Sequence, residues 1–222
     1  MNTARITHKR FGGAAAFTLS NGLVSRTVLC HQTMATISVQ RRSLVGPEIE
    51  LVRATSRESI VTINGQTYTV GGATGQTDQA FLLNSDIAKL RPLNEDSIFL
   101  GVRTEPYKHP IPSPKRSAKS GISLVGTFEL TKGPAKGVRV QVRHTLFDDL
   151  PVVEKQVEVL NVTSATVRLN TIVFEELLTV EPDSVVDPTT QWERQSITVL
   201  SDFMFHGMTI SSANQIGTWT TD

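Results

Sequence analysis

The sequence predicts an all-β protein, a large antiparallel β-sandwich with little helix, built as a single domain over residues 1–222. Apolar and polar residues alternate through much of 137–180, which is typical of strands with one buried face, because successive side chains point to opposite sides. Asn64-Gly65 lies between two runs of alternating β-branched residues and predicts a tight hairpin. No stretch of ten or more residues has a helical period, and many short strands are typical of a sandwich or barrel.

The first 76 residues are expected to form hairpins in chain order. Ser20-Asn21-Gly22 is a turn between two of the strands, and Asn64-Gly65 is another. A glycine-rich loop follows at 71–76, but it lacks the P-loop lysine and no helix pattern follows it, so a phosphate-binding loop is not expected. The expected strands span 16–19, 23–30, 36–40, 50–53, 59–63 and 66–70.

Residues 77–121 differ in character from the segments around them. One helical turn is expected over 86–90. The stretch 105–120 is rich in proline and in basic side chains, which predicts an extended surface loop. Tyr107 is the only aromatic residue among these charges, so the loop does not match the pattern of a nucleic-acid-binding segment.

The strand pattern resumes at 122–131 and leads into 137–180. There the alternation predicts three consecutive antiparallel strands, with turns at 148–151 and 163–165. His144 is assigned to the polar side of its strand, with Arg139, Gln141 and Arg143. Two further strands are expected at 196–200 and 203–210.

Composition excludes several classes of partner. Lysine and arginine number 22 against 21 aspartate and glutamate, and the formal charge of +1 gives no electrostatic case for nucleic acid or an anionic membrane. No run of about 18 apolar residues is present, and the N-terminus lacks the apolar core of a signal peptide, so a cytoplasmic location is expected. Cys30 is the only cysteine, and neither it nor His31 and His206 have metal-ligand spacing, so no metal or cofactor is expected.

Residue chemistry suggests two kinds of candidate site, a carboxylate pair and a carbohydrate-binding surface. Asp148 and Asp149 form an inviting carboxylate pair, but Asp before Leu-Pro is ordinary turn chemistry, and the turn is the preferred interpretation. Carbohydrate contact is the second possibility, since sugar rings stack on exposed aromatics while polar groups bind hydroxyls. Packing of the two tryptophans in the core or at its rim is the alternative. The candidates for carbohydrate contact are Trp192, Trp219, Asp187 and Arg194.

Three stretches together resemble a known family. They are Phe-Thr-Leu-Ser-Asn-Gly-Leu-Val-Ser-Arg at 17–26 with Ala35-Thr36, the run 61–76, and the order strand, Asp-Leu-Pro-Val-Val, strand, Asn-Val-Thr-Ser, strand within 137–180. Residues 188–222 extend the pattern. The chain resembles the N-terminal domain of α-galactosidase-like enzymes of glycoside hydrolase family 36 and its relatives.

The resemblance implies a fold, a partner and an absence of catalysis. In that family the domain is a β-supersandwich with a galactose mutarotase-like fold, and it precedes a (β/α)₈ barrel that holds both catalytic aspartates. No catalytic residue is therefore carried over to this chain. Such a barrel needs about 250 residues, so we expect the chain to be the N-terminal part of a longer hydrolase or a protein reduced to its accessory domain. The implied partners are the barrel or like subunits, and carbohydrate.

Two alternatives stay open. The first is a stand-alone, mutarotase-like sugar epimerase, which would need a histidine acid and a carboxylate base across a cleft. His144 or His206 with Glu175 are its candidates, although the asparagine-histidine motif of that family is missing. The second alternative is a structural β-sandwich that mediates contacts between subunits.

Overall fold

The computed structural model describes residues 2–11, 13–42, 47–77, 81–107 and 119–180. Within these residues the protein consists of antiparallel sheets, one short helix, α1 (Asn84–Ile87), and one 3₁₀ turn (Gly133–Ala135). The predicted all-β sandwich with little helix is confirmed. The expected strands at 196–200 and 203–210 lie outside the described residues. Among the described residues, no helix is both long enough and apolar enough to cross a membrane.

The first sheet is an antiparallel meander with the strand order β1-β2-β3-β4-β5. Gly22, at φ +79°, lies in the predicted turn between the second and third strands. The first strand was not expected, because its side chains are mostly polar and exposed, as is usual for a strand at a sheet edge. The five strands are β1 (Arg5–Phe11), β2 (Ala14–Ser20), β3 (Val24–Cys30), β4 (Met34–Arg41) and β5 (Ile49–Glu50).

The second sheet has four strands in the order β11-β12-β13-β14. The sequence did not predict the first of these, because a bulge between Phe99 and Gly101 shifts the register and interrupts the alternation. Glu105 and Pro106 end this strand, so the predicted loop at 105–120 starts too early; 108–118 lie outside the described residues. The strands are β11 (Ser97–Pro106), β12 (Gly121–Leu130), β13 (Arg139–Phe147) and β14 (Val153–Leu160).

The third sheet brings together segments far apart in the sequence. β7 (Ser59–Ile63) and β8 (Gln66–Val70) form the predicted hairpin, with Asn64 at φ 51° and Gly65 at φ 78° in its turn. β15 (Leu169–Val173) pairs with β7. The prediction of three consecutive paired strands in 137–180 is therefore wrong for the third, since alternation identifies a strand but not its neighbour.

Two short pairs complete the described strands. β6 (Val52–Ala54) pairs with β16 (Leu178–Thr179), and β9 (Ala73–Thr74) pairs with β10 (Arg91–Pro92). The first pair holds the end of the described chain against the edge of the first sheet, where the Val180 amide also donates a 2.9 Å hydrogen bond to the Leu51 carbonyl.

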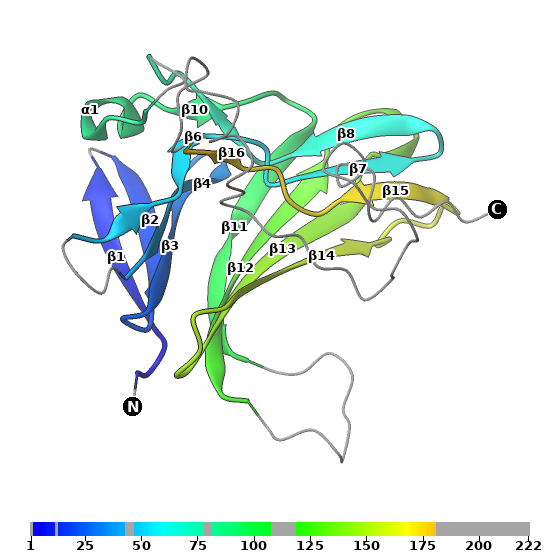
Figure 1. The fold of residues 1–222 in the computed structure, drawn as a ribbon. Coiled ribbons are helices and arrows are strands. Elements are labelled where there is room, and N and C mark those ends of the chain that lie inside the picture. The colour runs from blue at the N-terminus through cyan, green and yellow to red at the C-terminus, as the bar shows by residue number, and fades with distance from the viewer. Residues whose placement is uncertain (1, 12, 43–46, 78–80, 108–118, 181–222) are drawn as a thin grey trace, which may run out of the picture.

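The main core lies on one face of the four-stranded sheet. Figure 1 shows the five-stranded sheet beside the lower part of the four-stranded sheet, with β7, β8 and β15 across its upper part. A smaller core on the other face of the five-stranded sheet includes Ile87 of α1. The core side chains that join the three sheets include Leu19, Val28, Val61, Tyr68, Leu124, Val140 and Val142.

Candidate functional site

Five ionisable side chains meet between the sheets and form what we call the inter-sheet network. Three lie on strands of the two larger sheets, one precedes β7, and one follows β15. Four are buried, with 0% to 6% of the side chain exposed, and the fifth, Glu175, is 31% exposed. The network consists of Arg26 (β3), Glu58, His144 (β13), Lys155 (β14) and Glu175.

Glu58 is the central acceptor of the inter-sheet network. Its Oε1 accepts hydrogen bonds from the backbone amide of Thr36 and, at 2.8 Å, from the Thr36 hydroxyl. Its Oε2 lies 3.0 Å from His144 Nε2 and 3.0 Å from Lys155 Nζ. One carboxylate therefore joins β4 of the first sheet to β13 and β14 of the second.

Glu175 supplies the second carboxylate. Arg26 donates two hydrogen bonds to it, from Nη1 to Oε2 at 2.7 Å and from Nη2 to Oε1 at 3.2 Å. This is the strong bidentate geometry of an arginine–carboxylate pair. Lys155 Nζ donates to Glu175 Oε1 at 2.6 Å. Arg26 Nη2 also lies 3.8 Å from Glu58 Oε2. Each cation thus interacts with both carboxylates, which is what makes burial of three charges, on Arg26, Lys155 and Glu58, tolerable.

His144 is neutral in this environment. Burial, together with the nearby Arg26 charge, lowers the pKa of His144 to about 4. Its Nε2 carries the proton that is donated to Glu58, because a carboxylate can only accept. The Nδ1 atom is buried and has no hydrogen-bond partner in the part of the chain that the structure describes. Two cations and two carboxylates then balance, and the histidine adds no charge.

The pKa of Glu58 reflects two opposed effects. Burial alone raises the pKa of this carboxyl. The Lys155 ammonium and the His144 hydrogen bond outweigh burial and hold the pKa of Glu58 well below its usual range, so Glu58 stays charged. Burial, with the Glu58 charge adding to it, raises the pKa of the Cys30 thiol, which keeps this cysteine in its unreactive form.

A histidine, a carboxylate and a lysine in contact are the groups that enzymes use for proton transfer. Here His144 is 0% exposed and Glu58 is 1% exposed, and neither lines the two cavities described below. Within the part of the chain that the structure describes, neither group is open to a substrate. The inter-sheet network is therefore a polar link between the sheets, and Glu175 is its most exposed member.

The sequence pattern predicts two members of the inter-sheet network, His144 and Glu175, and assigns His144 to the wrong side of its strand. His144 lies on the buried face with Val140 and Val142, so its assignment to the polar side of the strand was wrong by one residue. The structure brings His144 and Glu175 into one network, in which they are linked through Glu58 and Lys155 rather than in direct contact. His206 lies outside the described residues.

A signal for two missed members is present in the sequence. Arg26 lies between Val24 and Val28 on the apolar side of β3, and Lys155 lies between Val153 and Val157 on that of β14. A charge on the buried side of a strand needs a buried partner. Glu58 has no such signal, because it stands just before its strand, outside any alternation.

Asp148 and Asp149 form the predicted turn and hold the N-terminus in place. Asp149 adopts φ 54°. Asp148 accepts a 2.6 Å hydrogen bond from the amide of Ala4, and Asp149 accepts one from the amide of Asn2. The hydrogen bonds from Ser120 and the Ala4 amide hold the pKa of Asp148 below its usual value. Each carboxylate thus has its own backbone partner, as expected for the turn that the sequence predicts.

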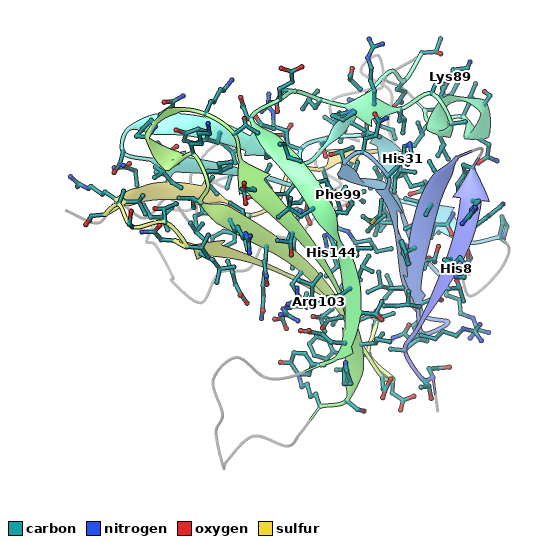
Figure 2. The ribbon with its side chains drawn as sticks, turned by 180° about the vertical axis from the view of Figure 1, so that it is seen from behind. His8, His31, Lys89, Phe99, Arg103 and His144 are labelled. Atoms are coloured by element: carbon teal, nitrogen blue, oxygen red, sulfur yellow. The ribbon has the colours of Figure 1, made fainter. Side chains whose placement is uncertain are left out.

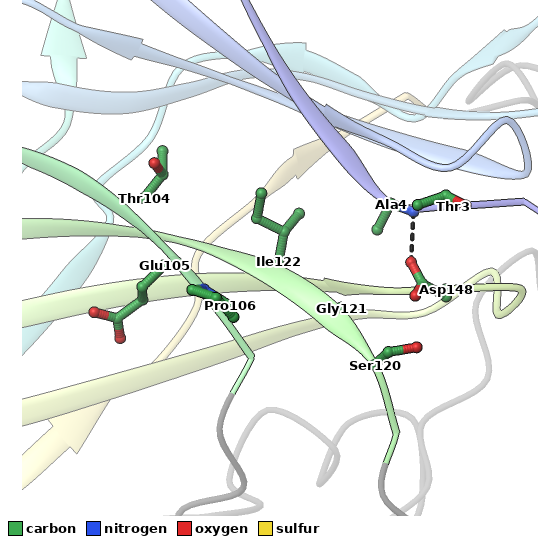
Figure 3. Close-up of a pocket in the computed structure, with 9 residues that line it drawn as sticks. All are labelled: Thr3, Ala4, Thr104, Glu105, Pro106, Ser120, Gly121, Ile122 and Asp148. Carbon is green, nitrogen blue, oxygen red and sulfur yellow. Dashed lines mark hydrogen bonds between the residues drawn. The ribbon is translucent and has the colours of Figure 1, made fainter.

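A shallow cavity of about 300 Å³ lies beside this turn, where the N-terminal residues pass the ends of β11 and β12 (Figure 3). Its charged side chains are Glu105 and Asp148, which both have partners in the protein. A second hollow lies on the other face of the four-stranded sheet. Among the described residues no group of three or more histidine, cysteine, aspartate or glutamate side chains could hold a metal ion.

The predicted carbohydrate contacts fall outside the described residues. That prediction involves Trp192, Trp219, Asp187 and Arg194. A scan against protein-family models finds no match, and comparisons with curated proteins and with solved structures find no significant match.

Proposed function

We propose that this chain is a non-catalytic, carbohydrate-associated sandwich domain of an α-galactosidase-like glycoside hydrolase. In this proposal it is the N-terminal supersandwich, and it packs on a catalytic (β/α)₈ barrel and helps shape the sugar site. The three stretches that resemble family 36 support the family. The all-β architecture of antiparallel sheets is compatible with it.

The closed inter-sheet network is the observation that carries the non-catalytic role. Glycoside hydrolysis needs two carboxyl groups that face the substrate across about 5–10 Å. The two carboxylates of the network instead share Arg26 and Lys155, and Glu58 is sealed from solvent. The side chains best suited to proton transfer are thus used to join the sheets.

The same observation weighs against the sugar-epimerase alternative. A neutral His144 with a pKa of about 4 is a poor general acid near pH 7, and its side chain is 0% exposed among the described residues. Glu175 is the accessible carboxylate of the pair, but both of its oxygens already accept hydrogen bonds from Arg26 and Lys155.

Two assays test the proposal. The complete reading frame that contains this chain should hydrolyse p-nitrophenyl α-D-galactopyranoside, and residues 1–222 alone should not. Residues 1–222 should also leave the rate of α–β interconversion of galactose and glucose at the buffer rate in polarimetry. Faster interconversion that is lost in His144→Gln would establish the epimerase instead. A reading frame without a barrel would leave the domain without its proposed partner and contradict the proposal.

A further inference from the structure

The face of the four-stranded sheet that points away from the core carries a second organised set of polar side chains. Register places residues of neighbouring strands in cross-strand rows, Arg103, Val125, Arg143 and Gln156 in one and Gly101, Thr127, Gln141 and Glu158 in the next. Figure 2 shows Arg103 on this face of the sheet. We call it the outer polar face.

Hydrogen bonds between side chains order this face. Arg103 donates from Nε to Glu105 at 3.1 Å and from Nη2 to Gln141 at 3.2 Å. Arg143 donates to the other oxygen of Glu105. Val125, between the two arginines, is fully buried although it lies outside the main core. The long polar side chains therefore form a layer over this face of the sheet and cover the smaller Val125 between them.

A hollow of about 300 Å³ opens at the edge of this layer. It exists because of the bulge in β11, where Leu100 is an extra residue that has no counterpart on β12. The next residue, Gly101, has φ +138°, and no atom lies within 4 Å of where a Cβ would stand. Leu100 is 50% exposed, and the remaining lining residues are Val102, Arg103 and Thr127.

The chemistry of the hollow selects for a neutral polyhydroxyl ligand. On the outer polar face, Arg103 and Arg143 both pair with the carboxylate of Glu105, and register places Glu154 of β14 on the same face, so neither a polyanion nor a polycation is favoured. Fixed donors and acceptors beside an exposed aliphatic side chain match a sugar ring, whose hydroxyls both donate and accept while its C–H groups are apolar.

We propose that this hollow is a binding site for one hexopyranose unit of a neutral glycan. In this site Leu100 packs against the C–H groups of the ring, and Arg103 and Thr127 hydrogen-bond its hydroxyls. Gln141 holds the Arg103 guanidinium in position. The inference deepens the carbohydrate association in the proposed function and rests on it for the class of ligand, but it involves none of the tryptophans predicted from the sequence.

Titration of residues 1–222 with raffinose, melibiose, maltotriose and cellotriose, followed by amide NMR shifts, tests the site. At least one of these sugars should shift the amides of Leu100, Gly101 and Thr127. Arg103→Ala should weaken that binding about tenfold, as expected for loss of a hydrogen bond from a charged group. Thr127→Val, which keeps the side-chain volume, should also weaken it.

Arg139→Ala is the matched control. Arg139 is on the same face and is as exposed as Arg103, 46%, and it also pairs with one glutamate. It stands on β13, two strands away from the bulge in β11. Because Arg139 does not line the hollow, this variant should bind the sugar as the unchanged protein does. No shift with any of the four sugars, shifts confined to other residues, or binding of heparin in place of neutral sugars would overturn the proposal. Hydrolysis by the full-length Arg103→Ala protein separates the two proposals, since it tests the domain assignment independently of the hollow.

Discussion

Glu58 shows how much of this fold can depend on a single residue. Its carboxylate accepts hydrogen bonds from a threonine on the first sheet and from a histidine and a lysine on the second. Buried charges of this kind contribute little net stability as a set, but removal of one partner leaves the others uncompensated in a medium of low dielectric constant. The energetic consequence therefore appears on mutation.

Glu58→Ala is expected to lower the free energy of unfolding by about 3–5 kcal/mol, because Lys155 and Arg26 lose a buried counter-charge. Urea denaturation followed by fluorescence measures this loss. Glu129→Ala is the control, since Glu129 forms an exposed pair with Arg139 and should cost less than about 1 kcal/mol. Equal costs for the two variants would show that burial adds nothing to the Glu58 interactions.

The pH dependence of stability is a second residue-level prediction. The pKa of His144 is about 4 in the folded protein and about 6.5 in an unfolded chain. The unfolded chain therefore binds the proton first as pH falls. Full stability is present above pH 6.5 and is lost toward pH 4, with a slope of up to about 1.4 kcal/mol per pH unit. Titration of Glu58, whose pKa is held well below 4.5, adds a further loss only at lower pH.

Urea denaturation at a series of pH values between 6.5 and 4.5 measures that slope. In His144→Gln the slope of stability against pH should fall by up to about 1.4 kcal/mol per pH unit, which corresponds to one proton. The glutamine amide group can still donate a hydrogen bond to Glu58. His31→Gln, at an exposed position, should keep the slope of the unchanged protein. A slope that His144→Gln leaves intact would assign the pH dependence to other groups.

At the scale of elements, local turn chemistry predicts the hairpins well. The Asn64-Gly65 turn has positive φ at both residues, as a two-residue hairpin with a type I′ turn requires. The turn is also hydrogen-bonded to β15 and the residue before it. The Arg168 amide donates to the Asn64 side chain, and the Gly65 amide donates to the Asn170 side chain. The turn thus contacts three strands, and the sequence predicts the pairing of only two of them, β7 and β8.

Gly65→Ala is expected to cost about 1–2 kcal/mol, since an L-residue at φ +78° pays the left-handed penalty. Gly13→Ala is a matched control: an added Cβ meets no atom within 4 Å at either position, but Gly13 does not have a left-handed φ. The control should change the urea midpoint little, or raise it slightly. A similar loss in both variants would mean that conformation at Gly65 is not the cause.

On the scale of the whole molecule, the two larger sheets approach closely where Met34 of β4 lies over Gly126 of β12. A Cβ at Gly126 would collide with the Met34 sulfur, and Met34 is itself fully buried. Phe99 borders the same space. The spacing between the sheets is therefore set at this point by a residue without a side chain.

Gly126→Val should overpack this contact and destabilise the protein by about 1–3 kcal/mol. Met34→Ala makes room for the added side chain, so the same substitution should cost less in a Met34→Ala background. A thermal or urea double-mutant cycle measures the coupling, expected at about 1 kcal/mol or more. Strict additivity would show that the two positions do not share a contact.

The candidate sites were accessible to sequence reasoning only in part. A charge on the apolar side of a strand, as at Arg26 and Lys155, indicates that a buried partner exists but cannot say which residue it is. The hollow on the outer polar face depends on a bulge at Leu100, and a bulge leaves only a broken alternation in the sequence. A glycine at position 101 does not by itself indicate, in the sequence, that a hollow lies beside it.

The sequence by itself determined the all-β class, the hairpin at Asn64-Gly65 and the turn at 148–149, because alternation and turn preferences act between near neighbours in the chain. Only the tertiary structure decided that β15 pairs with β7 and that the inter-sheet network forms. His144 and Glu58 are 86 residues apart, and Arg26 and Glu175 are 149 apart. Contacts at such separations follow from the order in which strands pair and sheets pack, and a local pattern does not encode that order.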